Sequence, residues 1–113
     1  MKIEYGQIWF ADLEPTRFNE QGRSRPVLVA SGAVLNDLPI RHAYVVPITT
    51  KDRRLLHHIE VSGSGLHAKS WAMPEYQRSL STYRFMKHLG WASSETMAEV
   101  DEWIGYFIRP LFD

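Results

Sequence analysis

The stretch "NEQGRSRPVLV" (residues 19–29) places a charged polar segment directly before an apolar run. Pro26 opens the run, a position where a strand tolerates the missing backbone N–H, so we expect a strand over 26–31. The seven residues before it carry a carboxylate, amide groups and two guanidinium groups. Functional residues concentrate in loops held by rigid strands, so this segment is a candidate site. The alternative is that Glu20 and Arg25 only form a surface ion pair, which contributes at most about 1 kcal/mol.

Short β-type segments extend on both sides of this stretch. "GQIWFADL" (6–13) alternates as a strand does, and "AYVVPITT" (43–50) is β-branched, with Pro47 indicating a bulge or an edge position. We also expect a strand over 57–65 that runs into a glycine-serine turn, and a weaker one over 70–80 that Pro74 interrupts.

Two helical segments follow. Residues 81–89 form a short helical turn in this interpretation, capped by Ser81 and ended by Gly90. Ser93 or Ser94 caps a longer helix that Pro110 ends. Its apolar stripe comprises Met97, Val100, Ile104, Phe107 and Ile108. Short strands followed by one amphipathic helix predict a single α+β domain over 1–113, mainly β, in which a helix packs across a small curled sheet or barrel.

Composition limits the function classes. The chain has no cysteine, so a disulfide or a thiolate metal site is excluded. No apolar run approaches the roughly 20 residues that cross a bilayer, and the start does not read as a signal peptide, so we expect a cytoplasmic protein without a membrane partner. The net charge is zero, but residues 17–90 hold eleven Lys or Arg against five Asp or Glu, a net of +6. A local positive field is compatible with that distribution, as is an ordinary mixed surface.

Several catalytic chemistries find no support. His57 and His58 are adjacent in an expected strand, so their side chains should point to opposite faces and not share a metal ion. A pair of distant histidines acting as acid and base stays possible in principle. The chain has no GxSxG elbow, and "SGSG" (62–65) lacks the lysine of a phosphate-binding loop.

What remains is the arginine-bearing loop, the pair Thr49-Thr50 at a strand end, and the basic segment "KDRR" (51–54). Phe18 and Tyr76 add aromatic rings. Guanidinium groups for phosphates and rings for base stacking suit a single-stranded nucleic acid.

At this point a resemblance adds to the interpretation. "GQIWFADLEPTRFNEQGRSRPVLVAS", followed by "VVPIT" and "PEYQRSLSTYRFMKHLGWASSETMAEVDEWI", closely resembles the MazF/PemK/Kid family of bacterial toxin endoribonucleases, from Gly6 to the last helix. The resemblance implies an SH3-like barrel of the CcdB/MazF/Kid type with a C-terminal helix, forming a homodimer. It implies metal- and cofactor-independent cleavage of single-stranded RNA at short sequences by 2′-hydroxyl attack. It also implies a cognate antitoxin whose acidic, flexible tail occupies the RNA groove, with DNA contacted only through that antitoxin.

The resemblance carries over to individual residues. Arg25 and Thr49 match the catalytic arginine and threonine, and we add the hypothesis that Glu20 is the base for the 2′-hydroxyl, because arginine is a poor base. The expected RNA-binding set is Phe18, Asn19, Gln21, Arg23, Lys51, Arg53, Arg54, Glu75, Tyr76 and Arg78.

This sequence departs from the family pattern at three positions. Phe18 and Asn19 replace the usual Gly-Ser, and Tyr76 stands where glutamine usually follows the acid. Two alternatives therefore stay open: a non-catalytic CcdB-like inhibitor of DNA gyrase, and a degenerate member that binds RNA or antitoxin without cutting.

Overall fold

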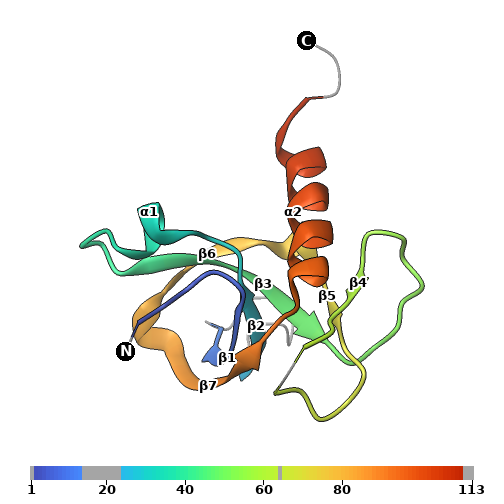
Figure 1. Cartoon of the computed structure of the whole chain (residues 1–113), viewed down its shortest axis with the longest axis horizontal. Helices are drawn as coiled ribbons and strands as arrows, with labels where there is room; N and C mark the ends of the chain where they lie inside the picture. The colour runs from blue at the N-terminus through green and yellow to red at the C-terminus, as the bar shows by residue number, and fades with distance from the viewer. Residues whose placement is uncertain (1, 14–23, 64, 111–113) are drawn as a thin grey trace.

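The computed structural model describes residues 2–13, 24–63 and 65–110. A seven-stranded sheet forms most of it, in the order β4-β5-β3-β2-β1-β7, with β6 also paired to β3 (Figure 1). All strand pairs are antiparallel. The strands are β1 (Gln7–Asp12), β2 (Ser24–Val29), β3 (His42–Thr49), β4 (Ile59–Glu60), β5 (Trp71–Ala72), β6 (Arg78–Ser81) and β7 (Phe85–Trp91). The helices are α1 (Ala33–Asn36), α2 (Ser94–Ile108) and the 3-10 turns η2 (Pro74–Tyr76) and η3 (Thr82–Arg84).

The sheet is buried on both faces. It curls around one core on the first face, and helix α2 packs on a second core on the other face. Alternate residues of β2 separate the two cores: Val27 and Val29 join the cluster with Trp9 and Phe85, whereas Leu28 joins the second. That second cluster also contains Val46, Ile48, Ile59, Met97 and Val100. This double burial explains why the central strands are continuous apolar runs rather than alternating ones.

Helix α2 confirms the expected C-terminal helix and its cap. The Ser93 hydroxyl accepts a hydrogen bond from the Thr96 N–H (3.1 Å), and Glu95 lies in the first turn. Met97 and Val100 are buried, but Phe107 and Ile108 are 47% and 69% exposed. The predicted stripe is therefore core only in its first half, and the helix projects beyond the sheet toward its C-terminal end (Figure 1).

The expected α+β fold, mainly β, is confirmed, but the sheet is not a closed barrel. Within the described ranges, β4 and β7 are the first and last strands of the sheet order. The segments next to them meet at the isolated bridge Gly63–Ala92. Gly63 and Gly65 make a close approach possible: both have positive φ, and an added Cβ would lie 2.1 Å from the carbonyl oxygen of Trp91 or Leu89. The loop after β4 thus rests directly on the backbone of β7.

The predicted strands over 6–13, 26–31 and 43–50 are confirmed to within two residues as β1, β2 and β3. Pro47 is not at a sheet edge, because β3 is a central strand. On the side of β3 away from β2, β6 pairs with β3 as far as Val45, and β5 pairs with it from Ile48 onward. Pro47 falls between these two partners. A missing N–H costs least at that switch.

Three other segments differ from the prediction. Of 57–65, Ile59–Glu60 forms β4; the residues before it form a turn, in which the His58 N–H donates to the Leu55 carbonyl oxygen (3.0 Å). The segment 70–80 divides around Pro74 into β5, η2 and β6. Of 81–89, Ser81 caps η3 as expected, but Phe85–Trp91 pairs with β1 as strand β7. Burial of Phe85 against Trp9 outweighs the local turn preference there.

Across the described ranges, no helix is both long enough and apolar enough to cross a membrane.

Candidate active site

Arg25 and Thr49 lie just beyond the last pair of the β2–β3 ladder, Val27–Pro47. Continuing this antiparallel register by two residues would place Arg25 across from Thr49. Side chains opposite each other in such a ladder share a face and have Cβ atoms about 4.5–5.5 Å apart. Both residues lie at the end of the sheet, on the face where Val27 and Val45 point into the first core.

Arg25 is half-buried, and its environment suits a bound anion. Its Nε atom is buried and has no hydrogen-bond partner among the described residues. Burial, and second the positive charge of Arg53, lower the pKa of Arg25 below its ordinary value. Two guanidinium groups therefore act on the same small region, and an anion there would relieve both penalties.

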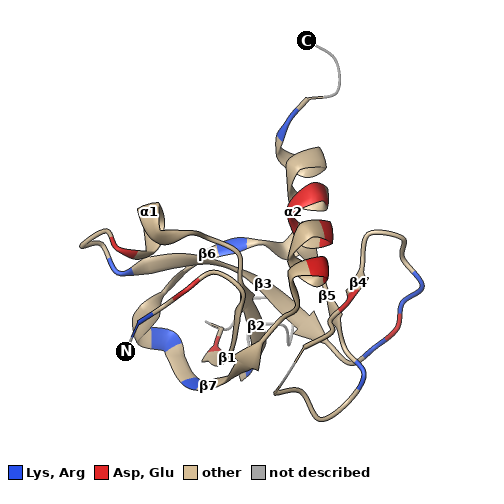
Figure 2. Ribbon diagram, viewed as in Figure 1, with Lys and Arg blue, Asp and Glu red and all other residues tan. Residues whose placement is uncertain are grey.

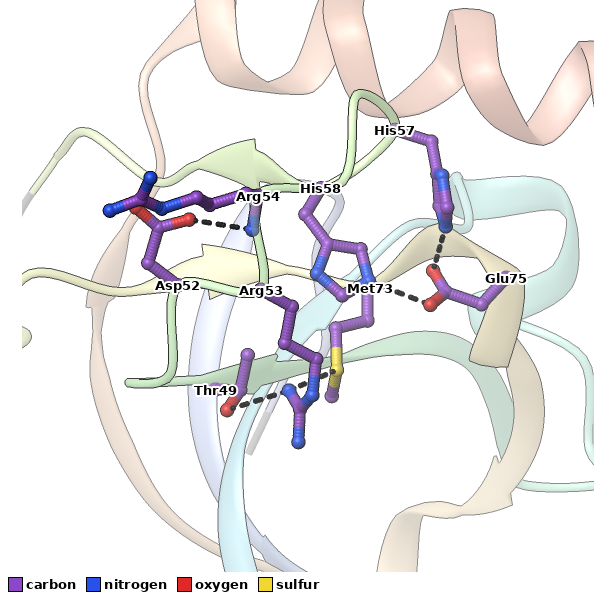
Figure 3. Close-up of polar contacts among 8 residues, drawn as sticks. All are labelled: Thr49, Asp52, Arg53, Arg54, His57, His58, Met73 and Glu75. Carbon is purple, nitrogen blue, oxygen red and sulfur yellow. Dashed lines mark hydrogen bonds and ion pairs between the residues drawn. The ribbon is translucent and has the colours of Figure 1, made fainter.

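Thr49 is 8% exposed, and its hydroxyl organises the start of the basic loop. Its Oγ1 atom accepts hydrogen bonds from the Lys51 backbone N–H (3.1 Å) and from Nη1 of Arg53 (3.4 Å). The same Nη1 lies 3.7 Å from Sδ of Met73, so Arg53 is held between β3 and the residue after β5 (Figure 3). The hydroxyl proton of Thr49 remains available for a further acceptor, since both of these hydrogen bonds use its oxygen as acceptor.

Lys51 and Arg54 are exposed on the loop between β3 and β4. Asp52 shapes this loop by accepting a hydrogen bond from the Arg54 N–H (2.9 Å), and Arg54 adopts a left-handed backbone conformation (φ 55°). Figure 2 shows the cations of this loop on one side of the molecule and acidic residues along α2. Other Lys and Arg residues lie near β6 and β7, across the molecule from this loop, so the cations are not gathered on one side (Figure 2).

The remaining predicted residues with described positions lie along η2 and β6. Tyr76 is 50% exposed, so its ring is open to a stacking partner. Arg78 is half-buried and pairs with Val45, four residues along β3 from Thr49. At about 3.3 Å per residue, that is roughly 13 Å from the strand end. Arg78 could contact a chain several nucleotides long, but it lies away from the Arg25–Thr49 pair.

The prediction that the side chains of His57 and His58 point to opposite faces is wrong. Neither residue is in a strand, and the two side chains converge on Glu75 (Figure 3). Nε2 of His58 lies 2.6 Å from Oε2 of Glu75, and Nε2 of His57 lies 3.3 Å from Oε1. The chain bends before β4 begins, so the alternation of a strand does not apply.

This contact sets the ionisation of Glu75. Burial raises the pKa of the carboxyl group, but the hydrogen bond from His58 and the charges of both histidines outweigh burial. The net pKa lies below the ordinary value. Glu75 is therefore an anion near neutral pH, held by two imidazole rings.

Five predicted residues, Phe18, Asn19, Glu20, Gln21 and Arg23, lie outside the described residues. The structure tests neither their positions nor the base role of Glu20.

Sequence reasoning missed the part of Met73, His57 and His58 in this region. No sequence signal marked these residues. In the structure, Ile59 pairs with Ala72, and extending this register by one residue sets His58 across from Met73. That register depends on two strands of two residues each, which no sequence pattern identifies.

Solved structures of MazF proteins share this fold. A crystal structure of MazF from Deinococcus radiodurans superposes with a TM-score of 0.83 at 23% identity, covering 96% of this chain and 97% of that one. The MazE-MazF complex from the same organism gives 0.73 at 21% identity, covering 96% of each chain. At this level of identity the likeness establishes the fold: a curved antiparallel sheet with a C-terminal helix.

The sequence matches establish the family. Residues 4–108 match the family described as the PemK-like, MazF-like toxin of type II toxin-antitoxin systems. Endoribonuclease MazF9 of Mycobacterium tuberculosis is 30% identical over 104 residues, covering 86% of this chain and 88% of the relative. Endoribonuclease EndoA of Bacillus subtilis is 32% identical over 109 residues, covering 90% of each. This chain belongs to the PemK-like, MazF-like toxin family.

Proposed function

We propose that this protein is a toxin endoribonuclease that cleaves single-stranded RNA, including mRNA, at short sequences without a metal ion. The observation that supports the proposal is the position of Arg53, which donates a hydrogen bond to Thr49 (3.4 Å) and whose charge lowers the pKa of Arg25. Two relatives that match most of this chain, MazF9 and EndoA, are named endoribonucleases. Both residues of the expected catalytic pair are present, which favours cleavage over a binding-only role.

The proposed reaction is a transesterification. The ribose 2′-hydroxyl attacks the neighbouring phosphorus, the P–O5′ bond breaks, and the products are a 2′,3′-cyclic phosphate and a 5′-hydroxyl. Negative charge accumulates on the phosphoryl oxygens in the transition state. Arg25 offers a fork of N–H donors there and Thr49 one O–H donor, so both stabilise that charge.

Two protons must move in this scheme. Glu20 accepts the proton of the attacking 2′-hydroxyl, since Arg25 has no acceptor atom. Arg25 returns a proton to the departing 5′-oxygen, and its lowered pKa makes it a better donor than an exposed arginine. The five-residue spacing between Glu20 and Arg25 motivates this assignment.

The RNA strand would follow the basic edge of the sheet. Lys51, Arg53 and Arg54 neutralise phosphates, and Phe18 and Tyr76 stack on bases. The remaining contacts are assigned to Asn19, Gln21, Arg23, Glu75 and Arg78. The partners in this proposal are a second copy of the chain and an antitoxin whose acidic tail competes for the same positive groove.

The test is incubation of the purified chain, freed of any copurified antitoxin, with a long single-stranded RNA in EDTA, followed by mapping of product ends. Arg25→Ala and Thr49→Ala are compared with Lys69→Ala, which removes an exposed cation paired with Glu60. We expect discrete cuts with cyclic phosphate and 5′-hydroxyl ends, lost in the first two variants and kept in the third.

Other outcomes separate the alternatives. RNA retained in a gel without products indicates a binding-only member, and intact RNA with poisoned gyrase indicates the CcdB-like activity. Glu20→Gln with near-normal turnover and an unchanged pH–rate profile would remove Glu20 from the base role while leaving cleavage itself intact.

A further inference from the structure

We propose that His57, His58 and Glu75 form a Zn²⁺ site, which contains none of the proposed RNA-cleaving groups and shares only Glu75 with the proposed RNA contacts. Each residue offers one ligand atom, and these atoms all lie within 4.8 Å of one another. Two imidazole nitrogens and a carboxylate oxygen are a three-ligand set that zinc uses in proteins, with a fourth position open to water.

The two imidazole rings meet different oxygens of the Glu75 carboxylate, so a bound ion would draw the three groups together around it. Ligand atoms about 2.0–2.1 Å from a tetrahedral zinc ion are roughly 3.3 Å apart. Nε2 of His57 and Oε1 of Glu75 already have that separation, at 3.3 Å. Nε2 of His58 and Oε2 of Glu75 are at hydrogen-bond distance, 2.6 Å, so zinc would replace the proton between them and move them slightly apart.

The surroundings hold the ligands in place while leaving an entry path. The His58 side chain is 3% exposed, whereas those of His57 and Glu75 are 25% and 26% exposed. The His57 ring packs on Trp103 and Phe107 of α2, with centroids 5.9 and 5.6 Å away, and edge-on to His58 at 4.9 Å. An ion can therefore reach the outer two ligands from solvent and meet the third one already oriented.

The ligand chemistry selects the kind of metal. Imidazole suits Zn²⁺, Cu²⁺ and Ni²⁺, whereas Mg²⁺ and Ca²⁺ require mostly oxygen ligands. A ligating histidine usually donates its other ring N–H to an acceptor, and Nδ1 of His58 is buried without a partner among the described residues. We therefore expect micromolar binding, weaker than a four-ligand structural site.

The experiment is calorimetric titration of the full chain, with any purification tag removed, using ZnCl₂ and, separately, MgCl₂. We expect one Zn²⁺ per chain and no binding of Mg²⁺. His57→Gln and Glu75→Gln should each weaken Zn²⁺ binding by about tenfold or more. His67→Gln, which removes an exposed histidine outside the cluster, should not change it.

Thermal unfolding gives a second, independent readout. A ligand that binds the folded state raises the unfolding temperature, so Zn²⁺ should raise it for wild type and His67→Gln but not for His57→Gln. His57 is partly exposed, so its variant retains the buried His58 contact. Equal Zn²⁺ affinity in wild type and His57→Gln, or equal binding of Mg²⁺, would overturn the proposal. Because no RNA is present, these results are independent of the proposed cleavage.

Discussion

Two neighbouring clusters of this molecule are built in different ways. Arg25 and Thr49 belong to two long strands, β2 and β3, and lie two residues beyond the last pair of their ladder, Val27–Pro47. The His57–His58–Glu75 cluster lies on a turn and the 3-10 helix η2, beside strands of two residues each. Among the described residues, Nε of Arg25 has no hydrogen-bond partner in the first cluster, whereas the Glu75 carboxylate in the second is paired with both histidines. The difference suggests that the first is arranged for a ligand from outside and the second is complete as a structural contact until a metal enters.

The largest effect is expected from a substitution at Arg25 in the first cluster. Arg25→Lys keeps the positive charge but loses the planar fork of donors. If Arg25 stabilises the phosphoryl charge, cleavage should fall by about 10²–10³-fold, the usual effect of removing such a donor. Single-turnover kinetics on a short RNA would measure it, and the unfolding midpoint should hardly change. Near-wild-type turnover in Arg25→Lys would mean that charge alone suffices.

A smaller effect should follow from loss of the Thr49 hydroxyl. Thr49→Val conserves shape and removes the hydroxyl, so we expect a decrease of roughly ten- to a hundredfold in cleavage. Thr49→Ser keeps the hydroxyl and serves as the matched control, with activity close to wild type. If valine and serine behave alike, the hydroxyl does not contact the reacting phosphate.

The second cluster should respond in stability. Glu75→Gln removes the charged partner of the buried His58, and we expect a loss of about 1–2 kcal/mol in the free energy of unfolding. Glu60→Gln removes an exposed carboxylate paired with Lys69 and should cost less than about 0.5 kcal/mol. Urea denaturation of the two variants would measure the contrast. Equal losses would show that the histidine cluster contributes no more than a surface ion pair.

Acid should weaken the second cluster by the same route. The pKa of Glu75 is lowered in the folded protein, so its contribution to stability is present above the unfolded value near 4.5 and is lost as pH falls through the folded value. The stability difference between wild type and Glu75→Gln should therefore shrink in that acidic range. A difference that stays constant down to the lowest pH at which the protein folds would contradict this linkage.

The smallest expected effect concerns the exposed loop beside Thr49. Lys51→Ala should weaken RNA binding modestly and for all sequences alike. If Lys51 contacts one phosphate, the slope of log affinity against log salt should become less steep by about 0.7. RNA binding would be measured at several salt concentrations for Lys51→Ala in the catalytically inactive Arg25→Ala background and for that background alone. An unchanged slope would place Lys51 outside the RNA path.

The long elements of this fold could be predicted from sequence because local pattern and burial agree in them. "PVLV" and "AYVVPIT" are buried on both faces, and the Ser93 cap and the spacing of Met97 and Val100 define α2. The strand β7 could not, because "STYRFMKHL" has a capped turn at its start and its strand character depends on pairing with β1. Partners from distant segments decide such residues.

The candidate site likewise has one part that the sequence could predict and one part that it could not. Arg25 and Thr49 were identifiable because each stands at an end of a recognisable strand, and resemblance to a known family selected them. The convergence of His57 and His58 was not identifiable from the sequence. The predicted strand begins at residue 57 but β4 begins at Ile59, so the alternation of side chains along a strand does not apply to the two histidines. A cluster of side chains assembled at a bend therefore escapes a rule derived for extended chain.

The two glycines that rest on β7 have a genetic consequence. Any side chain at Gly63 or Gly65 would collide with a backbone carbonyl, which unlike a side chain cannot move aside. In a selection for cells that survive expression of this toxin, single-base changes in those two codons should be recovered together with changes at Arg25. The survivors would then report on how the loop after β4 is seated, at positions that carry no functional group at all.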